Sequence, residues 1–113
     1  MTAPAEPDTL PDIQIELAPA VNTETQLDPP TRVLLHNDDV TTMEFVILVL
    51  RSIFELAWID AERVMLVAHV NGIALVGVYP LEEAKYKVGQ AHALARAEGF
   101  PLTLTIEPEE SSG

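Results

Sequence analysis

Four polar residues that can bind a ligand or exchange protons follow an apolar stretch. They are an amide, two carboxylates and a hydroxyl in the segment HNDDVTTMEFV: Asn37, Asp38, Asp39 and Thr41. Paired carboxylates suit general acid and base catalysis, but adjacent residues usually point in different directions, and Ser52 has no histidine near it in sequence. We therefore expect no enzyme activity. Two interpretations stay open for these residues, a turn whose side chains cap the next helix or a binding site.

A histidine in the apolar segment VMLVAHVNG is the second candidate. Met65, Ala68, His69 and Gly72 are spaced by three and four residues, so they share one face of a helix. That face can meet the loop that carries Asn37, and polar groups would then be set into an apolar wall. The alternative is a hydrogen-bonded histidine of the core.

Metal and cofactor sites are not expected. The three histidines, His36, His69 and His92, show no spacing typical of metal ligands, and the chain has no cysteine. The glycines form no phosphate-binding loop. We therefore expect neither a metal ion nor a cofactor.

The charge of the chain limits its partners. Among 113 residues, six are Lys or Arg and 18 are Asp or Glu, so the formal net charge of −12 disfavours nucleic acids and anionic membranes. No stretch reaches the roughly 18 apolar residues of a membrane span, and the N-terminus lacks the pattern of a signal peptide. With 48% hydrophobic residues the chain can build one core, and we expect a soluble, cytoplasmic protein.

Composition divides the chain into three parts. Residues 1–31 are acidic, rich in proline and free of Lys and Arg, which predicts a disordered arm. Residues 32–108 carry the periodic apolar pattern of the single domain, and residues 109–113 form a short disordered tail. The candidate residues above all fall in the domain.

The polar loop is expected between a strand and a helix. The strand covers residues 31–36, and a helix of about residues 42–56 follows, begun by a capping box of Thr41 and Glu44. Spacings of three and four residues predict its buried face, which comprises Met43, Val46, Ile47, Leu50, Ile53 and Phe54.

Two further helices and two strands complete the expected fold. A helix from Asp60 is apolar on nearly every side, which predicts that it is largely buried, and Gly72 ends it. A strand over 73–79, a helix over 80–99 and a last strand over 102–107 follow. The order β-α-α-β-α-β predicts a small α+β sandwich with helices on one side of three strands.

Charged residues gather near the start of the third helix, beside Tyr79. They are Glu82, Glu83, Lys85 and Lys87. Two interpretations stay open, a solvated helix face or a contact with a partner.

Four segments together resemble the ClpS family: NDDVTTMEFVILVL, VMLVAHVNG, GVYPLEEAKYKV and FPLTLTIE. The resemblance runs over residues 32–107 in register. ClpS proteins are adaptors that deliver substrates with destabilising N-terminal residues, called N-degrons, to the unfoldase of a bacterial Clp protease. The resemblance implies a three-stranded antiparallel sheet packed against three helices, and a monomer.

The resemblance also implies roles for particular residues. The free α-amino group of a substrate would be bound by Asn37, Asp38 and His69. The first side chain, a Leu, Phe, Tyr or Trp, would enter a pocket lined by Asp39, Thr41, Met43, Val46, Met65, Ala68 and Leu102. The N-terminal domain of a ClpA- or ClpC-type unfoldase would contact Tyr79, Glu82 and Lys87.

Four positions differ from the common pattern of the family. Val40 stands where an aromatic residue is usual, and Thr42 where proline is usual, which predicts a less rigid loop. His36 replaces an apolar residue. Ala68 replaces valine on the pocket wall, so we expect a roomier pocket that tolerates bulky first residues such as Trp or Phe.

Two other classes of protein share these features in part. The C-terminal domain of the acidic ribosome-stalk protein shares the small sandwich fold, but it would not need the NDD segment, methionines and histidine around a pocket. The ClpS-like substrate domain of a ubiquitin ligase would lie in a much longer chain. Binding of a peptide with a free N-terminal aromatic residue separates the adaptor from the stalk-like module.

Overall fold

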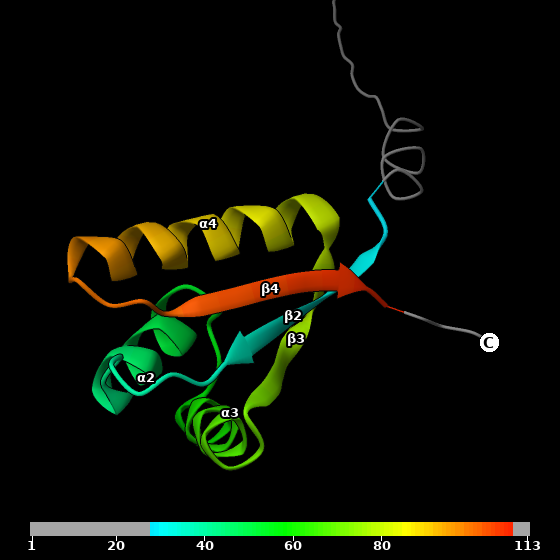
Figure 1. Cartoon of the computed structure of the whole chain (residues 1–113). Helices are drawn as coiled ribbons and strands as arrows, with labels where there is room; N and C mark the ends of the chain where they lie inside the picture. The colour runs from blue at the N-terminus through cyan, green and yellow to red at the C-terminus, as the bar shows by residue number, and fades with distance from the viewer. Residues whose placement is uncertain (1–27, 110–113) are drawn as a thin grey trace, which may run out of the picture.

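Three antiparallel strands and three helices make up the computed structural model, which describes residues 28–109 (Figure 1). In chain order they are β2 (Pro30–His36), α2 (Met43–Ser52), α3 (Trp58–Asn71), β3 (Ile73–Pro80), α4 (Leu81–Ala97) and β4 (Thr103–Pro108). Both outer strands pair with β2, in the order β3-β2-β4. The predicted order of elements and the α+β class are confirmed.

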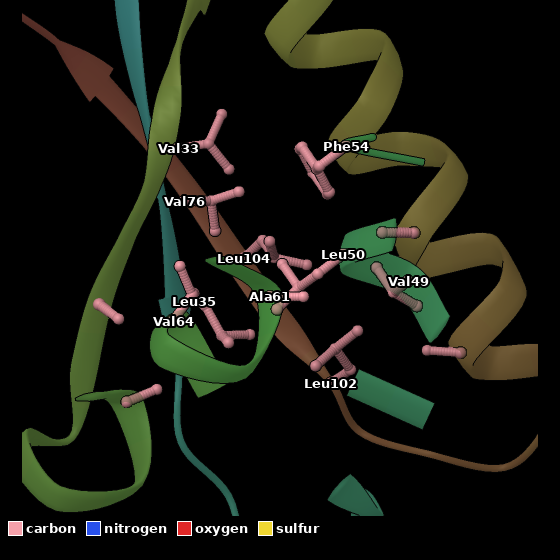
Figure 2. Close-up of a cluster of buried hydrophobic side chains, with 14 of the residues drawn as sticks. Val33, Leu35, Val49, Leu50, Phe54, Ala61, Val64, Val76, Leu102 and Leu104 are labelled. Carbon is pink, nitrogen blue, oxygen red and sulfur yellow. The ribbon is translucent and has the colours of Figure 1, made fainter. Parts of the chain in front are cut away.

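Each strand buries one face and leaves the other face open. In β2, Val33 and Leu35 are buried, while Leu34 between them is partly exposed. Leu104 pairs with Leu35 and is buried on the same face. Figure 1 shows α4 running along the sheet, and Figure 2 shows strand side chains such as Val76 among those of the helices. The helices therefore cover the buried face, as predicted.

One cluster of apolar side chains joins the strands to the helices (Figure 2). The largest fully buried side chains are those of Val33, Val49, Leu50 and Leu102. Burying a side chain of this size contributes about 1.5–3 kcal/mol relative to leaving it exposed. Helix α4 adds small residues that are 0% exposed, Ala84, Ala91 and Ala95. Because these side chains are short, the backbone of α4 can lie close to the sheet.

Gly77 makes room for an aromatic side chain at an irregular point of the sheet. The pairing of β2 with β3 shifts between Val33 and Leu34, close to this glycine. A Cβ atom at Gly77 would come within 3.1 Å of the Tyr79 ring. The absence of a side chain at position 77 therefore allows the Tyr79 ring to occupy its place in β3.

Helix α2 begins one residue later than predicted. Thr42 is its N-cap, and the Thr42 hydroxyl oxygen accepts a hydrogen bond from the backbone N–H of Phe45 at 3.1 Å. The predicted capping box of Thr41 and Glu44 is wrong, because the Thr41 hydroxyl donates to Asp38 instead, at 2.9 Å. The threonine that stands where the family usually has proline thus supplies the cap.

The buried face of α2 also differs from the prediction. Phe45 and Val49 are buried together with Leu50, whereas Met43 is 52% exposed. The Phe45 ring packs against Phe100, with 4.9 Å between the ring centroids. The helix therefore turns Phe45 and Val49 toward the core, and Met43 lies at the edge.

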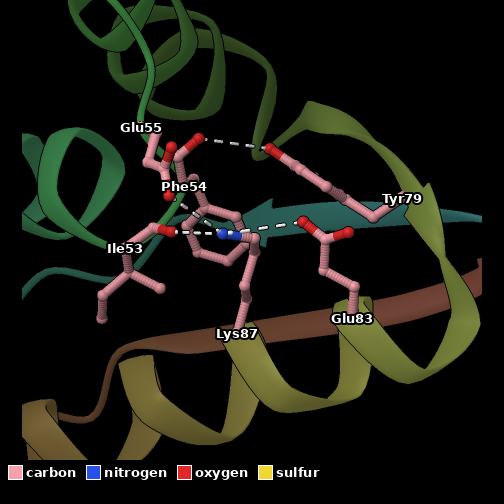
Figure 3. Close-up of polar contacts among 6 residues, drawn as sticks. All are labelled: Ile53, Phe54, Glu55, Tyr79, Glu83 and Lys87. Carbon is pink, nitrogen blue, oxygen red and sulfur yellow. Dashed lines mark hydrogen bonds and ion pairs between the residues drawn. The ribbon is translucent and has the colours of Figure 1, made fainter. Parts of the chain in front are cut away.

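Lys87 of α4 reaches the connection between α2 and α3 (Figure 3). Its Nζ donates a hydrogen bond to the backbone oxygen of Ile53 at 2.8 Å. Two residues further on, Glu55 has a φ of 59°, in the left-handed region that does not continue an α-helix. For these reasons α2 ends at Ser52, and the predicted end near residue 56 is wrong.

Helix α3 starts at Trp58, two residues before the predicted start, and is less buried than predicted. Its buried residues are Ala61, Val64 and Ala68, whereas Ile59 is 72% and Val70 is 77% exposed. Apolar residues on nearly every side do not mean burial here, because only one side of the helix meets the core. Gly72 ends the helix with a φ of 89°, as predicted.

Helix α4 covers the outer edge of β4 at one point. The Nε2 atom of His92 accepts a hydrogen bond from the backbone N–H of Leu104 at 3.0 Å. This contact satisfies a donor that the edge of a sheet would otherwise leave free. Burial, with a smaller effect of the nearby Arg96, lowers the pKa of His92 from its ordinary value of 6.5. At neutral pH the ring is therefore uncharged and keeps its acceptor nitrogen.

We predict that His92 makes the stability of the domain depend on pH. As the pH falls below about 6.5, the imidazole takes up a proton in the unfolded chain but not yet in the folded domain, whose pKa is lower. The free energy of unfolding therefore decreases with falling pH until the pH is below the folded pKa as well. His92→Gln keeps an acceptor but does not titrate. Its free energy of unfolding should change less than that of the unsubstituted chain between about pH 7 and pH 5. Urea unfolding over this range measures both, and equal pH dependence would contradict the prediction.

Most of the predicted arm (1–31) and tail (109–113) lies outside the described residues. Pro30 and Thr31, at the end of the predicted arm, belong to β2. Within residues 28–109, no helix has the length and apolar character needed to cross a membrane.

Candidate functional site

A pocket of about 200 Å³ opens beside the end of β2, between the loop that follows this strand, α2 and α3. It is lined by Leu35, His36, Asn37, Asp38, Asp39, Thr41, Met43, Val46, Met65, Ala68, His69 and Leu102. All ten residues that the resemblance assigned to an amino-group site or a side-chain pocket are in this lining. The fold thus brings together residues from three stretches that are distant in sequence, residues 35–46, residues 65–69 and Leu102.

The side chain of Asp38 organises the loop. Its Oδ1 accepts hydrogen bonds from the backbone N–H groups of Val40 at 2.8 Å and Thr41 at 2.7 Å, and its Oδ2 accepts the Thr41 hydroxyl at 2.9 Å. Partial burial alone would raise the pKa of Asp38, but the hydrogen bonds from Thr41 and Val40 lower it below its ordinary value of 3.8. The pocket therefore contains a fixed negative charge at neutral pH.

Asn37 and His69 line the pocket from the loop and from the last turn of α3. The backbone N–H of Asn37 donates to the backbone oxygen of Gly72 at 3.0 Å, which ties the loop to the end of α3. Both residues are exposed, and their side chains form no hydrogen bond with another residue of the described part of the chain. The Asn37 amide oxygen and one nitrogen of a neutral His69 ring are therefore available to accept hydrogen bonds from a ligand.

The other part of the pocket is apolar. Ala68 and Leu102 are buried, Val46 and Met65 are partly exposed, and Met43 is half exposed. An engineered cavity of roughly 150 Å³ in another protein holds a benzene ring, so the volume here suits one aromatic side chain. A drug-sized ligand usually needs a pocket of about 300 Å³ or more. The dimensions therefore favour a single side chain over a larger ligand.

Two lining residues, Leu35 and His36, were not among the predicted site residues. Leu35 is a core residue of β2, and the His36 ring forms a hydrogen bond with the Thr105 hydroxyl at 2.8 Å. Their position in the sequence carried a signal, because they are the last two residues of the strand that leads into the polar loop.

The three residues predicted to contact an unfoldase are not part of the pocket lining. The Lys87 side chain is only 12% exposed, and its Nζ lies 3.7 Å from Glu55 and 3.8 Å from Glu83 (Figure 3). Glu82, in contrast, has a side chain that is 74% exposed. Of the two charged residues, Glu82 therefore offers more surface to a partner.

The third of these residues, Tyr79, is half-buried beside Lys87 (Figure 3). The Lys87 Nζ lies 5.8 Å from the centroid of its ring, and the Tyr79 hydroxyl donates a long hydrogen bond of 3.5 Å to the backbone oxygen of Phe54. Burial, followed by the charges of Glu83 and Glu55, raises the pKa of Tyr79 above its ordinary value of 10.0. The hydroxyl therefore stays protonated and keeps this contact at neutral pH.

Together, these features define a binding protein whose ligand has two chemically different parts. Hydrogen-bond acceptors and a carboxylate suit an ammonium group, and the apolar walls suit a side chain attached to it. Among residues 28–109, no three His, Asp or Glu side chains are arranged to hold a metal ion.

Comparison with known proteins gives the family. The model of the ClpS family, described as the ATP-dependent Clp protease adaptor protein ClpS, matches residues 26–105. The ClpS adapter protein of Desulfatibacillum aliphaticivorans is 49% identical over 78 residues, which are 69% of this chain and 75% of that relative. That of Oleidesulfovibrio alaskensis is 50% identical over 86 residues, 74% of this chain and 83% of the relative. The chain belongs to the ClpS family.

A solved structure agrees with this assignment. It is Agrobacterium tumefaciens ClpS2 bound to L-phenylalaninamide, which is 40% identical to this chain and matches it with a TM-score of 0.69. The match covers 73% of this chain and 99% of that chain. The match in structure therefore extends over nearly the whole of a ClpS domain.

Proposed function

We propose that this chain is an adaptor that binds the first residue of a substrate and delivers the substrate to a Clp unfoldase-protease. The observation that carries the proposal is the pocket itself, in which the free acceptors of Asn37 and His69 lie beside an apolar hollow of side-chain size. The related ClpS2 is bound to L-phenylalaninamide, which has both a free amino group and an aromatic side chain. This ligand supports the same choice of substrate here.

The amino group supplies the polar half of the recognition. An α-ammonium group has three N–H donors and one positive charge, which suit the Asn37 amide oxygen, the Asp38 carboxylate and a neutral His69 ring. Hydrogen bonds to a charged group contribute about 1.5–3 kcal/mol each. Because a protonated imidazole has no acceptor, His69 acts in its neutral form.

The first side chain supplies the apolar half. Burying a Leu or Phe side chain contributes about 1.5–3 kcal/mol, and the loss of translational and rotational freedom opposes it, so a Kd of about 1 μM or below is expected. The pocket walls assigned to this side chain are Asp39, Thr41, Met43, Val46, Met65, Ala68 and Leu102. We propose that the accepted first residues are Leu, Phe, Tyr and Trp.

A titration with two matched peptides tests this function. A peptide that starts with Phe is expected to bind. The same peptide with an acetylated N-terminus is expected to bind at least tenfold more weakly, because an acetyl amide has no charge and offers one N–H donor where the ammonium group offers three. Equal affinity for both peptides would refute the proposed recognition and favour a stalk-like module of the same fold.

The partner surface is proposed to lie around the start of α4. There the N-terminal domain of a ClpA- or ClpC-type unfoldase contacts Tyr79, Glu82 and Lys87, with Glu82 making the most direct contact because it is the most exposed. Lys87 and Tyr79 act mainly by holding the connection between α2 and α3 in place.

Charge reversal separates the two proposed surfaces. Glu82→Arg is expected to weaken binding to the unfoldase N-terminal domain at least threefold, while its affinity for a Phe-starting peptide stays unchanged because Glu82 does not line the pocket. Binding to the isolated N-terminal domain can be measured by calorimetry. An unchanged affinity would remove Glu82 from the contact.

The remaining parts of the proposal follow from membership of an adaptor family. The chain acts as a monomer in the cytoplasm, without catalysis or a cofactor of its own. Residues 1–31 serve in the handover of the substrate to the unfoldase. The net charge of −12 supports a protein partner rather than a nucleic acid.

A further inference from the structure

A second hollow, of about 320 Å³, lies between α2 and α3. It is lined by Met43, Glu44, Ile47, Trp58, Glu62 and Met65. The spacing of these residues explains the lining, because each helix contributes positions three or four residues apart, and such positions lie on one face. We call this hollow the α2–α3 groove.

The α2–α3 groove is continuous with the pocket. Met43 and Met65 line both, so these two side chains form the wall between them. Two residues of extended chain span about 7 Å. A peptide whose first side chain occupies the pocket therefore has its next residues within reach of the groove.

The chemistry of the groove is apolar with two negative charges. Trp58 is 54% and Met43 is 52% exposed, which leaves an aromatic and a thioether surface open to a ligand. Glu44 and Glu62 form no ion pair with another residue of 28–109, and residues 1–27 contain no Lys or Arg that could neutralise them. The groove therefore combines an apolar surface with unneutralised carboxylates.

Trp58 already shows which kind of group its ring accepts. The guanidinium of Arg51 lies 5.7 Å from the centroid of the ring, one helical turn beyond Ile47. Cations are attracted to the face of a tryptophan ring, and the stems of Lys and Arg side chains pack on apolar surfaces while their charged ends stay in water. A long cationic side chain fits both properties of the groove.

We propose that the α2–α3 groove binds the side chain of the second or third residue of a substrate, and that it selects a Lys or Arg there. The apolar stem lies on Trp58, Ile47 and the methionines, and the charged end lies near Glu44 and Glu62. This inference rests on the proposed function, because the first residue must occupy the pocket for its neighbours to reach the groove.

Titrations with peptides that share a free N-terminal Phe test the inference. Lys, Leu, Ala or Glu is placed at position two in one series and at position three in another, with no Trp or Tyr in the peptide. In at least one series, the Lys peptide is expected to bind at least about fivefold more tightly than the Glu peptide. Because Trp58 is the only tryptophan of the chain, its fluorescence reports occupation of the groove directly, and Lys should change it more than Ala.

Two double variants separate a local effect from the overall negative charge. In the double variant Glu44→Gln with Glu62→Gln, the affinities for the Lys peptide and the Glu peptide should differ by no more than about twofold. Glu98→Gln with Glu109→Gln removes the same charge from exposed positions outside the groove that form no ion pair within residues 28–109, and the preference should persist. Trp58→Ala should lower the affinity for the Lys peptide and leave the affinity for the Ala peptide unchanged.

The outcomes distinguish the two levels of the proposal. If Phe-starting peptides bind with the same affinity whatever follows the first residue, the groove inference is wrong and the proposed function stands. The same holds if the preference for Lys survives in the Glu44 and Glu62 double variant. If no peptide with a free N-terminal Phe binds, the proposed function fails, and the groove inference fails with it.

Discussion

Asn37→Ala and His69→Ala are each expected to weaken the binding of a Phe-starting peptide at least tenfold while the domain stays folded. Each substitution removes one acceptor for the α-ammonium group. A tenfold loss corresponds to about 1.4 kcal/mol, which is at the low end of what a hydrogen bond to a charged group contributes. Neither side chain is buried or bonded to the described part of the chain, so the fold does not depend on it.

Fluorescence polarisation of a labelled peptide measures this loss, and thermal unfolding checks the fold. His92→Gln serves as a matched control, because it removes an imidazole that lies outside the pocket and keeps the acceptor for Leu104. Its peptide affinity at about pH 7.5 should equal that of the unsubstituted chain. An unchanged affinity of Asn37→Ala or His69→Ala would remove that residue from the amino-group site.

Ala68→Val is expected to narrow the pocket and change its ranking of first residues. The side chain at position 68 is 2% exposed and lies in the pocket wall, so two added methyl groups occupy space that a large ring needs. One methylene in an apolar pocket changes affinity by about 10-fold to 200-fold. The affinity for Trp-starting and Phe-starting peptides should fall at least tenfold, and the affinity for a Leu-starting peptide should fall by less than about threefold.

Two controls accompany this substitution. Ala93→Val places the same side chain at an exposed position of α4. It measures how much a β-branched residue in a helix lowers the free energy of unfolding, about 0.5 kcal/mol. Thermal unfolding of Ala68→Val reports strain in the core, which would weaken all peptides alike. If the unsubstituted chain and the Ala68→Val variant rank the Leu, Phe, Tyr and Trp peptides in the same order, the alanine does not set specificity.

The elements of the fold could be predicted from the sequence because their periodicity is local. The alternation in β2, the Asn-Gly end of α3 and the proline before α4 each act through neighbouring residues. Details that depend on individual side-chain contacts, and not on periodicity, were predicted less well. The end of α2 depends on Lys87, and the cap of α2 depends on whether the Thr41 hydroxyl is already bonded to Asp38.

The site was predicted in a different way. Spacing placed Met65, Ala68 and His69 on one helix face, but it could not show that the loop at Asn37 meets this face. The resemblance supplied that pairing, and the backbone hydrogen bond from Asn37 to Gly72 is its physical counterpart. The α2–α3 groove was not predicted, because neither helix alone shows which exposed positions will lie opposite those of the other.

The hydrogen bonds of Asp38 also bear on the speed of recognition. Because its carboxylate already holds the backbone of Val40 and Thr41, the loop loses its conformational entropy when the chain folds and not when a ligand arrives. A binding site that is ordered beforehand can capture its ligand without a slow rearrangement. Substrates would then associate at similar rates whatever their first residue, and differences in affinity among N-termini would appear mainly as differences in dissociation rate.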